Sequence, residues 1–528
     1  MQVVAILLAG AAFAMALAKA IRVPAIPLLL LTGVLLANAG GLPADDLQDT
    51  IALGAAFLLF VGGLELNPGR AGAQLRPAIR VGSAQFFLLG FAGFGAARLL
   101  GFDLITSFYL ALALTASSTL VVVRLLQRRG QLFEPFGRLV LGTLLLQDLL
   151  IILIVPLVAQ FTFGVGSILR GLGATLALFA LAFLCLRLVT PWILALRDDE
   201  ESLMLAVLAL LFVFVGLAEV LGVSLVAGAF LAGVALSGFP VSGIVRGQLG
   251  SITDFFTALF FTALGGLIVL PTMHELARAL LLALVVVVIT PPLVTVMAER
   301  AGLSARAALE SGLLLSQTSE LSLVVALQGM VLGQITPSVF TVVAIVTALT
   351  MLLTPFITAD RVTRWLLRFH PVRAREVQPL PAANHVLLVG CGAAGLPLLE
   401  TLVATGSEVV VIDDDPAIIA QLREGEIPCV RGDAADPNTL AEAGIERARI
   451  IGSTIRRPRD NRLLLETAKD QLVLIRVFDD EDARWVSEHG GVPILSSETA
   501  AATFLHWFDE RFGRAERETA DSAPLEAR

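Results

Sequence analysis

Charged side chains are scarce in this sequence. Asp, Glu, Lys and Arg make up 16% of the 528 residues, whereas a typical soluble protein has about 25%. The scarcity is confined to one part, because residues 1–360 hold 35 charged residues and residues 361–528 hold 47. This split excludes one soluble globule, a disordered chain and a nucleic-acid-binding protein. We predict a polytopic membrane domain followed by a water-soluble, acidic domain.

Cysteine and lysine are scarcer still. The three cysteines, Cys185, Cys391 and Cys429, have no metal-ligand spacing, which argues against a zinc site and against a disulfide-stapled secreted domain. The two lysines are Lys19 and Lys469. No basic residue precedes the first apolar run, at residues 2–19, so we expect this run to be a retained membrane span and not a cleaved signal peptide.

Long apolar runs, in contrast, are abundant. A helix needs about 20 mostly apolar residues to cross a membrane, and we predict thirteen such spans joined by short loops. The windows lie at residues 2–19, 24–40, 50–66, 80–101, 104–127, 137–161, 166–196, 202–221, 223–239, 251–270, 274–297, 305–330 and 337–358.

Basic residues are distributed unequally between the loops on the two sides of these spans. Thirteen fall in one set of loops and three, Arg98, Arg170 and Arg278, in the other. Because basic loops stay in the cytoplasm, we predict an outside N-terminus and a cytoplasmic C-terminal domain. We expect a multi-pass protein of the cell inner (plasma) membrane.

One carboxylate lies deep in an apolar run. Asp148 has about ten apolar residues on either side, with Gln147 as its polar neighbour, whereas Glu65, Glu219, Asp254 and Glu310 lie near span ends. A carboxylate in hydrocarbon is costly and usually marks an ion or proton pathway. The alternative is a protonated carboxyl group that serves packing.

Two spans, the fifth and the twelfth, carry polar interruptions in the middle. The first contains Thr115, Ser117 and Ser118, and the second contains Ser316, Gln317, Thr318, Ser319 and Glu320. Paired interruptions of this kind are typical of broken helices in inverted-repeat transporters. The alternative is that the hydroxyl groups bond back to the preceding helical turn.

Asp148 near two half-helix ends could hold either a proton or a desolvated monovalent cation, and this competition suffices for exchange. Burial disfavours the charged carboxylate, so we expect protonation in the physiological pH range. No lysine lies deep in the predicted membrane region. An Asp–Lys pair that trades its proton is therefore excluded, which favours one proton per cation.

Five segments resemble the signature segments of the monovalent cation:proton antiporter-2 family, in its Kef-type potassium-efflux branch. They are residues 59–68, 137–157, 222–237, 254–269 and 313–329. The resemblance implies thirteen spans, a dimerisation domain, a mobile core with two crossed broken helices, and elevator-like alternating access. It also implies that Gln147 and Asp148 match a Gln-Asp pair associated with potassium preference. Residues 317–320 depart from the family, which more often has glycines before the Glu.

The C-terminal part begins, after a basic linker at 361–383, with an apolar strand, a glycine-rich turn, a helix and a second strand. The turn contains Gly390, Gly392 and Gly395, and Asp413 follows 23 residues after Gly390. This spacing predicts a Rossmann-like α/β domain at 384–510 that binds a nucleotide through the turn and its ribose through Asp413. The alternative is a domain that keeps the fold without binding.

Residues 384–510 resemble the potassium-transport nucleotide-binding (RCK/KTN, TrkA-N) domain. The resemblance implies that Asp433 is a second acidic contact for the ligand, which we expect to be NAD(H), AMP or another adenine nucleotide. The basic run Arg456, Arg457, Pro458 and Arg459 departs from the family. We expect residues 511–528 to be disordered.

The favoured function is antiport of a monovalent cation, K⁺ by preference, against H⁺ by alternating access, with a cytoplasmic regulatory domain. Its candidate ion-site residues are Thr115, Ser117, Ser118, Gln147, Asp148 and Glu320. The alternatives are a Na⁺/H⁺ antiporter and an RCK-gated potassium channel; the latter would need a TVGYG-type selectivity loop, which the sequence lacks. We expect a homodimer in membrane lipid, a transporter and not an enzyme, with no cofactor required for transport and no nucleic-acid partner.

Overall fold

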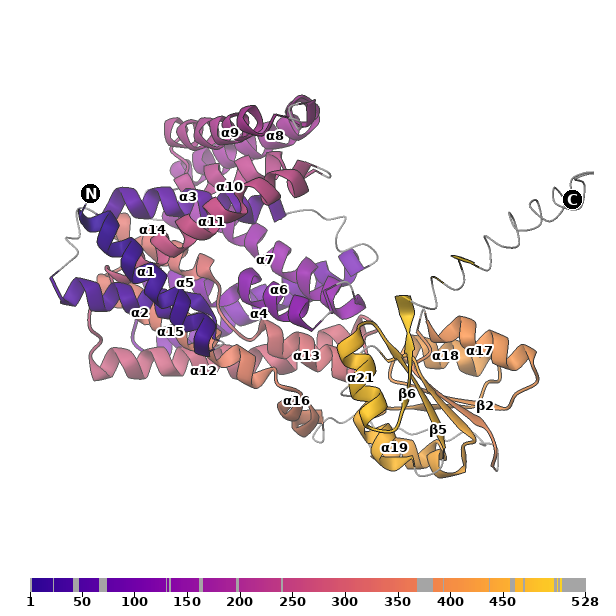
Figure 1. The fold of residues 1–528 in the computed structure, drawn as a ribbon. Helices are drawn as coiled ribbons and strands as arrows, with labels where there is room; N and C mark the ends of the chain where they lie inside the picture. Colours follow the sequence, from indigo (N-terminus) through magenta and orange to yellow (C-terminus); the bar gives the residue numbers. More distant parts are fainter. Residues whose placement is uncertain are drawn as a thin grey trace, which may run out of the picture. The chain divides into compact units, whose positions relative to one another are not determined.

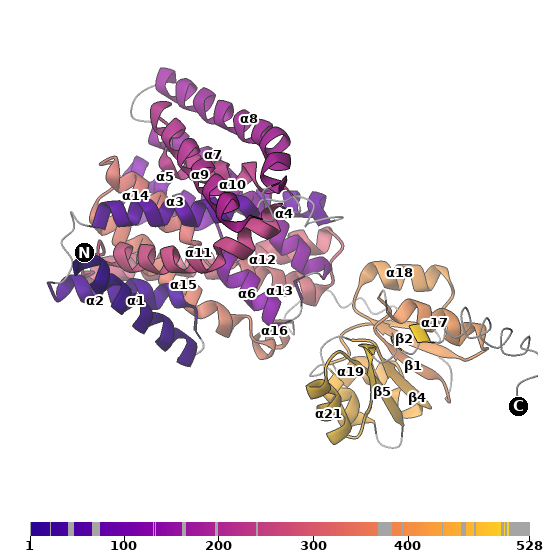
Figure 2. The same cartoon turned by 45° about the horizontal axis from the view of Figure 1, so that its top comes forward.

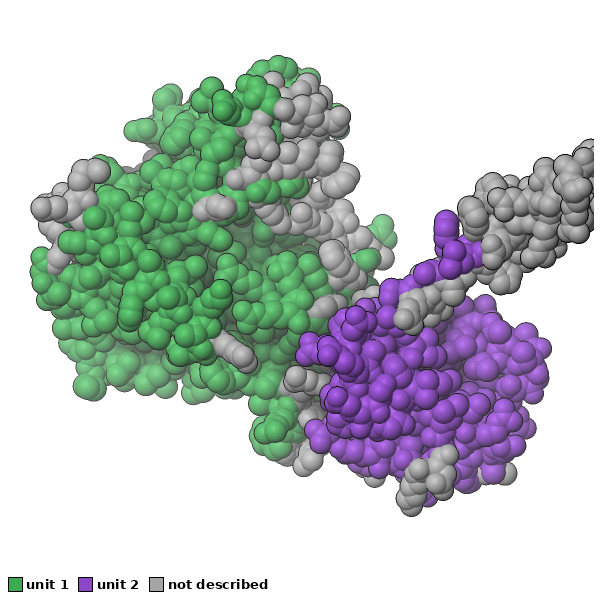
Figure 3. Space-filling view, viewed as in Figure 1, with its two compact units in different colours: residues 1–301, 307–369 green, residues 302–306, 370–528 purple. Residues whose placement is uncertain are grey.

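The computed structural model describes residues 2–21, 23–40, 47–65, 74–129, 131–132, 134–160, 165–195, 199–238, 241–367, 383–392, 394–435, 437–455, 461–468, 471–497, 501 and 504–505. The chain forms two compact units, shown in Figure 3. The first comprises residues 1–301 and 307–369, and the second comprises residues 302–306 and 370–528.

The first unit is helical throughout its described residues (Figures 1 and 2). Nine helical segments of this part are long and apolar enough to cross a membrane, and α2, α10 and part of α11 are shorter apolar helices. The helical membrane region is thus confirmed, while the count of thirteen spans stays a prediction. The helices are α1 (Gln2–Ile21), α2 (Ala25–Asn38), α3 (Gln48–Glu65), α4 (Leu75–Leu99), α5 (Leu104–Thr115), α6 (Thr119–Arg128), α7 (Pro135–Ala159), α8 (Val165–Ala195), α9 (Glu200–Val220), α10 (Leu225–Ala235), α11 (Val241–Gly265), α12 (Met273–Arg300), α13 (Ala305–Leu315), α14 (Glu320–Val331), α15 (Pro337–Ile357) and α16 (Asp360–Leu367).

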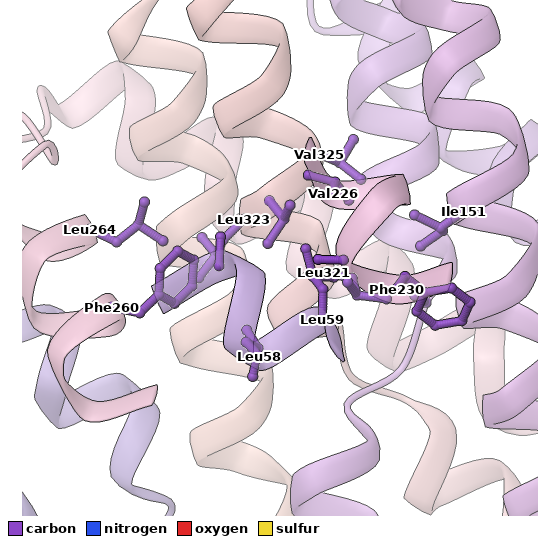
Figure 4. Packing of buried hydrophobic residues seen from close by; sticks show 14 of the residues in the cluster. Leu58, Leu59, Ile151, Val226, Phe230, Phe260, Leu264, Leu321, Leu323 and Val325 are labelled. Carbon is purple, nitrogen blue, oxygen red and sulfur yellow. The ribbon is translucent and has the colours of Figure 1, made fainter. Parts of the chain in front are cut away.

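These helices pack as two groups. In the first helix group, α1–α3 and α8–α11, helix α3 packs against α10 and α11, and α2 packs against α1 and α11. In the second helix group, α4–α7 and α12–α15, helix α4 packs against α5, α7 and α12, and α15 packs against α12 and α14. The groups meet where α15 contacts α2 and where α7 contacts α8 and α10. Apolar side chains of both groups share one buried cluster, in which Figure 4 shows Leu59 of α3, Phe230 of α10 and Leu321 of α14.

Two glycines bring α3 and α10 into backbone contact. A Cβ atom on Gly63 would lie 2.0 Å from the Phe230 carbonyl oxygen, and one on Gly233 would lie 2.0 Å from the Phe60 carbonyl oxygen. Small residues at a crossing let membrane helices approach closely, which favours dispersion contacts where the hydrophobic effect is weak. The pair therefore lets α3 and α10 cross with their backbones in contact.

The two predicted helix interruptions are present. Helix α5 ends at Thr115 and α6 begins at Thr119, and α13 ends at Leu315 while α14 begins at Glu320. Each second half starts on a serine cap: Ser118 accepts a hydrogen bond from the Val121 N–H, and Ser319 accepts one from the Leu321 N–H. A serine in extended backbone at this position satisfies donors that the new helix leaves unpaired. The breaks are thus built into the sequence.

The second unit contains a parallel six-stranded sheet in the order β3-β2-β1-β4-β5-β6. This is the strand order of a Rossmann fold, in which the order of strand addition reverses between β1 and β4 while all strands stay parallel. The strands are β1 (Val386–Val389), β2 (Val409–Asp413), β3 (Cys429–Arg431), β4 (Ile450–Ser453), β5 (Leu472–Val477) and β6 (Val492–Leu495), and the helices are α17 (Gly395–Ala404), α18 (Pro416–Glu424), α19 (Pro437–Glu442), α20 (Arg462–Thr467) and α21 (Asp480–Glu488).

Strands β1 and β2 are buried along their whole length, as expected of central strands covered on both faces. Among the described residues of this unit, apolar side chains fill two clusters. The predicted α/β class is therefore confirmed. Most of the basic linker, the basic run at 456–459 and the predicted disordered tail at 511–528 lie outside the described residues.

Candidate functional site

Asp148 lies on α7 beside the first helix break. Its side chain is 7% exposed, and its Oδ2 accepts a hydrogen bond of 3.2 Å from the Oγ1 of Thr119, the first residue of α6. Its Oδ1 is buried and has no hydrogen-bond donor within the described residues. A buried oxygen without a donor costs stability unless another group meets it. A proton or a cation bound to Oδ1 could satisfy this oxygen.

Gln147, the neighbour of Asp148, ties α7 to both breaks. Its Oε1 accepts a hydrogen bond of 3.1 Å from the Ser117 N–H. The Ser117 hydroxyl in turn donates to the Leu315 carbonyl at the end of α13, at 2.7 Å. Ser117 also accepts a hydrogen bond of 3.5 Å from Gln85 Nε2 on α4. One serine thus joins the two interrupted segments, which are 198 residues apart in the chain.

Glu320 begins α14 at the second break and is 7% exposed. Its carboxyl group interacts with the Ser118 side chain and with the Leu120 backbone, both from the first break. A second contact joins α14 to the helix before the first break, since the Ser322 hydroxyl donates a hydrogen bond to the Ala113 carbonyl of α5. The two breaks therefore meet, as the predicted crossing of broken helices requires.

Three carboxyl groups share this region. Glu320 and Glu65, the last residue of α3, both lie close enough to Asp148 to interact with it electrostatically. Asp148 contacts the first residue of α6, and Glu320 is the first residue of α14. The N-terminal end of a helix carries partial positive charge, which favours nearby anions. The half-helix ends thus compensate part of the carboxylate charge without a buried lysine.

The structure brings together five of the six predicted ion-site residues: Ser117, Ser118, Gln147, Asp148 and Glu320. The sixth, Thr115, donates its hydroxyl to the Leu112 carbonyl of its own helix, at 2.7 Å. Sequence reasoning missed Thr119 and Gln85. An amide inside the apolar run of α4 was the signal for Gln85; Thr119 gave no signal beyond its place next to the polar run.

The glycine-rich turn in the second unit has the geometry that a nucleotide phosphate needs. Gly390 has a φ of +84°, a conformation in which side chains other than hydrogen are strained. A Cβ atom on Gly395 would lie 2.1 Å from the Gly390 carbonyl oxygen, so only glycine allows this close approach of strand and helix. A Cβ atom on Gly392 would meet nothing within 4 Å, which leaves that backbone open to a ligand.

Asp413 ends β2 next to this turn. Its Oδ2 accepts a hydrogen bond of 2.6 Å from the Cys391 N–H, and its Oδ1 accepts one of 2.8 Å from the Asp415 N–H. Burial raises the pKa of the Asp413 carboxyl group, and these backbone donors offset part of the rise. Asp413 therefore supports the turn directly, besides any contact with a ribose.

Two more carboxyl groups lie near Asp413. Burial, together with the charge of Asp413, raises the pKa of Asp414 to about 6. The Oδ1 of Asp433 accepts a hydrogen bond of 2.9 Å from the Ala435 N–H. Its Oδ2 accepts one of 2.9 Å from the guanidinium group of Arg306, a residue that belongs to the second unit. The structure thus places Asp413 and Asp433 on one acidic edge of the sheet, with the Asp433 carboxylate already in an ion pair, while their contact with a nucleotide stays a prediction.

Comparison with protein families gives two matches. Residues 4–360 match the family model described as "Sodium/hydrogen exchanger, transmembrane", and residues 386–495 match the TrkA-N domain. The first match covers more than half of the chain, and the second covers the whole six-stranded sheet.

Individual relatives agree with the family matches. The chain is 27% identical to YbaL of Escherichia coli (strain K12), over 92% of this chain and 93% of that protein. It is 27% identical to the glutathione-regulated potassium-efflux system protein KefC of Enterobacter sp. (strain 638), over 82% of this chain and 71% of that protein. Among solved structures, the sodium proton antiporter MjNhaP1 of Methanocaldococcus jannaschii is similar over 69% of this chain and 97% of its own, with a TM-score of 0.54 and 16% identity, which shows the fold.

Proposed function

The chain belongs to the sodium/hydrogen exchanger family and carries a TrkA-N domain, and we propose that it is a K⁺/H⁺ antiporter regulated by a nucleotide at that domain. A multi-pass membrane cation/proton antiporter follows from the family. The potassium preference, the role of Asp148 and the nucleotide are the proposal. The exchanger match over residues 4–360 favours an antiporter over the channel alternative.

The observation that carries the proposal is the buried Asp148 oxygen without a hydrogen-bond donor in the described residues, at the meeting point of two broken helices. Oxygen atoms are the ligands that alkali cations prefer, and carbonyl groups at unwound helix ends add to a carboxylate in such a site. Nearby oxygens include the Thr119 hydroxyl, which bonds Asp148, and the Gln147 amide.

In the proposed mechanism, Asp148 binds either one proton or one cation. Protonation removes the charge that holds the cation, so a cation leaves when a proton arrives. Alternating access then carries Asp148 between the two sides of the membrane only when one of the two is bound. Movement of the second helix group against the first would supply this access, since the ion-site residues on α4, α6, α7 and α14 belong to the second group.

The cation preference rests on Gln147. An uncharged amide beside Asp148 leaves a single carboxylate of that pair for the cation, which suits the weakly hydrated K⁺ better than a second carboxylate would. KefC, a potassium-efflux protein by name, is among the relatives. The Na⁺/H⁺ antiporter remains the alternative, and we propose a homodimer in the inner membrane with the N-terminus outside.

Exchange in proteoliposomes tests the proposal. Addition of K⁺ should release protons, detected by a pH-sensitive dye, and Asp148→Asn should abolish this signal because the amide can hold neither a proton nor the cation charge. Asp49→Asn, an exposed carboxylate in the first turn of α3, is the matched control and should exchange normally. Exchange that persists in Asp148→Asn would refute the assignment.

We further propose that an adenine nucleotide binds the second unit at Gly390, Gly392, Gly395, Asp413 and Asp433 and alters the exchange rate. The support is the left-handed Gly390, the close packing at Gly395 and the open face of Gly392. The ligand supplies a pyrophosphate or phosphate to the turn and ribose hydroxyl groups to the carboxylates. A ribose hydroxyl at Asp433 would compete with Arg306 for the same carboxylate.

A further inference from the structure

A cavity in the first unit opens between the two helix groups. It is an open hollow, with about 820 Å³ of space between the protein atoms when the solvent at its mouth is included. Its walls come from α1, α2 and α11 of the first helix group and from α6 and α15 of the second. The lining residues lie near the end of α1, at the beginning of α2, along the whole of α6 and near the end of α15. The predicted orientation places the ends of α1, α6 and α15 on the cytoplasmic side.

The chemistry of the cavity is divided between an apolar wall and a charged rim. Met15, Ile26, Leu29, Val121 and Ala258 are among the apolar residues of the wall. A small hydrophilic anion gains nothing from such a wall, whereas the acyl chain of a membrane lipid meets there an apolar surface like the one that surrounds it in the bilayer. The wall therefore selects an amphiphile.

The rim carries one net positive charge. Arg124 and Arg128 lie one turn apart on α6, on the same face of the helix, and Asp254 of α11 lies 3.9 Å from Arg124. The side chains of Arg124 and Asp254 are 57% and 69% exposed, so this pair is weak. Arg128 forms no ion pair within the described part of the chain. Two guanidinium groups and one carboxylate match the single charge of a phosphodiester.

We propose that this cavity binds one anionic phospholipid, with the phosphodiester on Arg124 and Arg128 and an acyl chain along the apolar wall. The lipid would touch both helix groups at once. The wall of the cavity includes Leu120 and Val121, which directly follow Thr119, the donor of the hydrogen bond to Asp148. A bound lipid would therefore tie the position of α6 to that of α1, α2 and α11, and its presence would change the exchange rate. The effect on transport, unlike the binding, rests on the proposed antiport.

Native mass spectrometry of the full-length protein can count retained lipid. The probe is phosphatidylglycerol, with phosphatidylcholine of the same chains as the comparison. We expect selective retention of phosphatidylglycerol, weakened about fivefold for each arginine removed in Arg124→Gln and Arg128→Gln, since a basic residue near a lipid surface contributes about 1 kcal/mol. Arg138→Gln is the matched control, because Arg138 is an exposed arginine of α7 that does not line the cavity. Equal retention of the two lipids by the wild type would overturn the proposal.

A second variant separates the charge from the cavity. Ala258→Phe fills the wall and leaves both arginines in place, so it should also lose phosphatidylglycerol; retention as in the wild type would show adsorption to the rim alone and contradict the proposal. Exchange is then measured in liposomes with and without phosphatidylglycerol. A lipid-dependent rate in the wild type that disappears in both variants supports regulation. Selective binding without any exchange would instead count against the proposed antiport.

Discussion

Thr119 is the one residue seen to donate a hydrogen bond to Asp148 in the described part of the chain. We predict that Thr119→Val weakens cation binding without abolishing exchange, because the carboxylate remains but its orientation is lost. A hydrogen bond to a charged group contributes about 1.5 kcal/mol or more, so the cation concentration for half-maximal exchange should rise roughly tenfold. Thr119→Ser keeps the hydroxyl and should restore the wild-type value. An unchanged value in Thr119→Val would show that Thr119 serves only as the first residue of α6.

His385, at the start of the sheet in the second unit, is a buried titratable group. Its Nε2 lies 3.2 Å from the Ala443 carbonyl, and burial lowers the pKa of its imidazole. The unfolded chain takes up a proton near pH 6.5 while the folded one resists it, so stability is present above that pH and is lost as the pH falls.

We predict that His385→Gln, which keeps an N–H donor, removes part of the pH dependence of unfolding. Thermal unfolding of the full-length protein is compared between about pH 7.5 and about pH 5.5, where the wild type should lose more stability than the variant. Asp414, whose pKa burial raises to about 6, acts in the opposite direction in both proteins. The difference between the two proteins therefore isolates His385, and parallel losses would contradict the assignment.

At the level of helices and strands, the interrupted spans show what a sequence can predict. Polar runs at residues 115–118 and 316–320 predicted both breaks because serine and threonine compete with helical hydrogen bonds and favour helix starts. The structure adds that Ser118 and Ser319 cap while Thr115 and Ser316 bond back to the preceding turn, at 2.7 Å each. Both interpretations of the polar runs thus hold, each for different residues.

Contacts between distant helices were beyond the sequence. Gln85 and Glu65 lie on α4 and α3, and nothing in the local pattern says that they approach the breaks. Asp148 could be singled out because one buried carboxylate in an apolar run is anomalous wherever its neighbours lie. The pattern therefore identified the centre of the candidate ion site, whereas its surroundings depend on helix packing.

The crossing of α3 and α10 makes a prediction of its own. Gly63→Ala places a methyl group on the Phe230 carbonyl, 2.0 Å away, so the helices must separate. We expect a loss of about 1–3 kcal/mol, as in other overpacked interiors, seen as a lower melting temperature in detergent. Gly62→Ala is the matched control, since its methyl group would meet only Phe230 Cδ2 at 4.0 Å. Equal melting temperatures for the two variants would show that the crossing can relax.

At the scale of the whole molecule, the charge-poor part of the sequence corresponds to the helical exchanger region and the charge-rich part to the TrkA-N domain. Residues up to about 360 hold few charges, and at the candidate ion site the carboxyl groups are in contact with hydroxyl and helix-end groups. The second unit carries the acidic edge and the open glycine turn. If the second unit regulates transport, a ligand bound to it must change the rate of cation/proton exchange in the first unit.

Gly392 offers the sharpest test of that coupling. Its backbone needs no left-handed conformation, and a side chain there meets no protein atom within 4 Å, so Gly392→Val should leave the fold intact while it blocks a phosphate at the turn. We predict that NAD(H) or AMP raises the melting temperature of the wild type and changes its exchange rate, and that both responses vanish in Gly392→Val while exchange without nucleotide is unchanged. Asp413→Ala serves less well, because it also removes the acceptor of the Cys391 N–H. If the wild type shows no shift with any adenine nucleotide, the domain is structural; if the shift occurs but exchange does not respond, the domain binds without regulating.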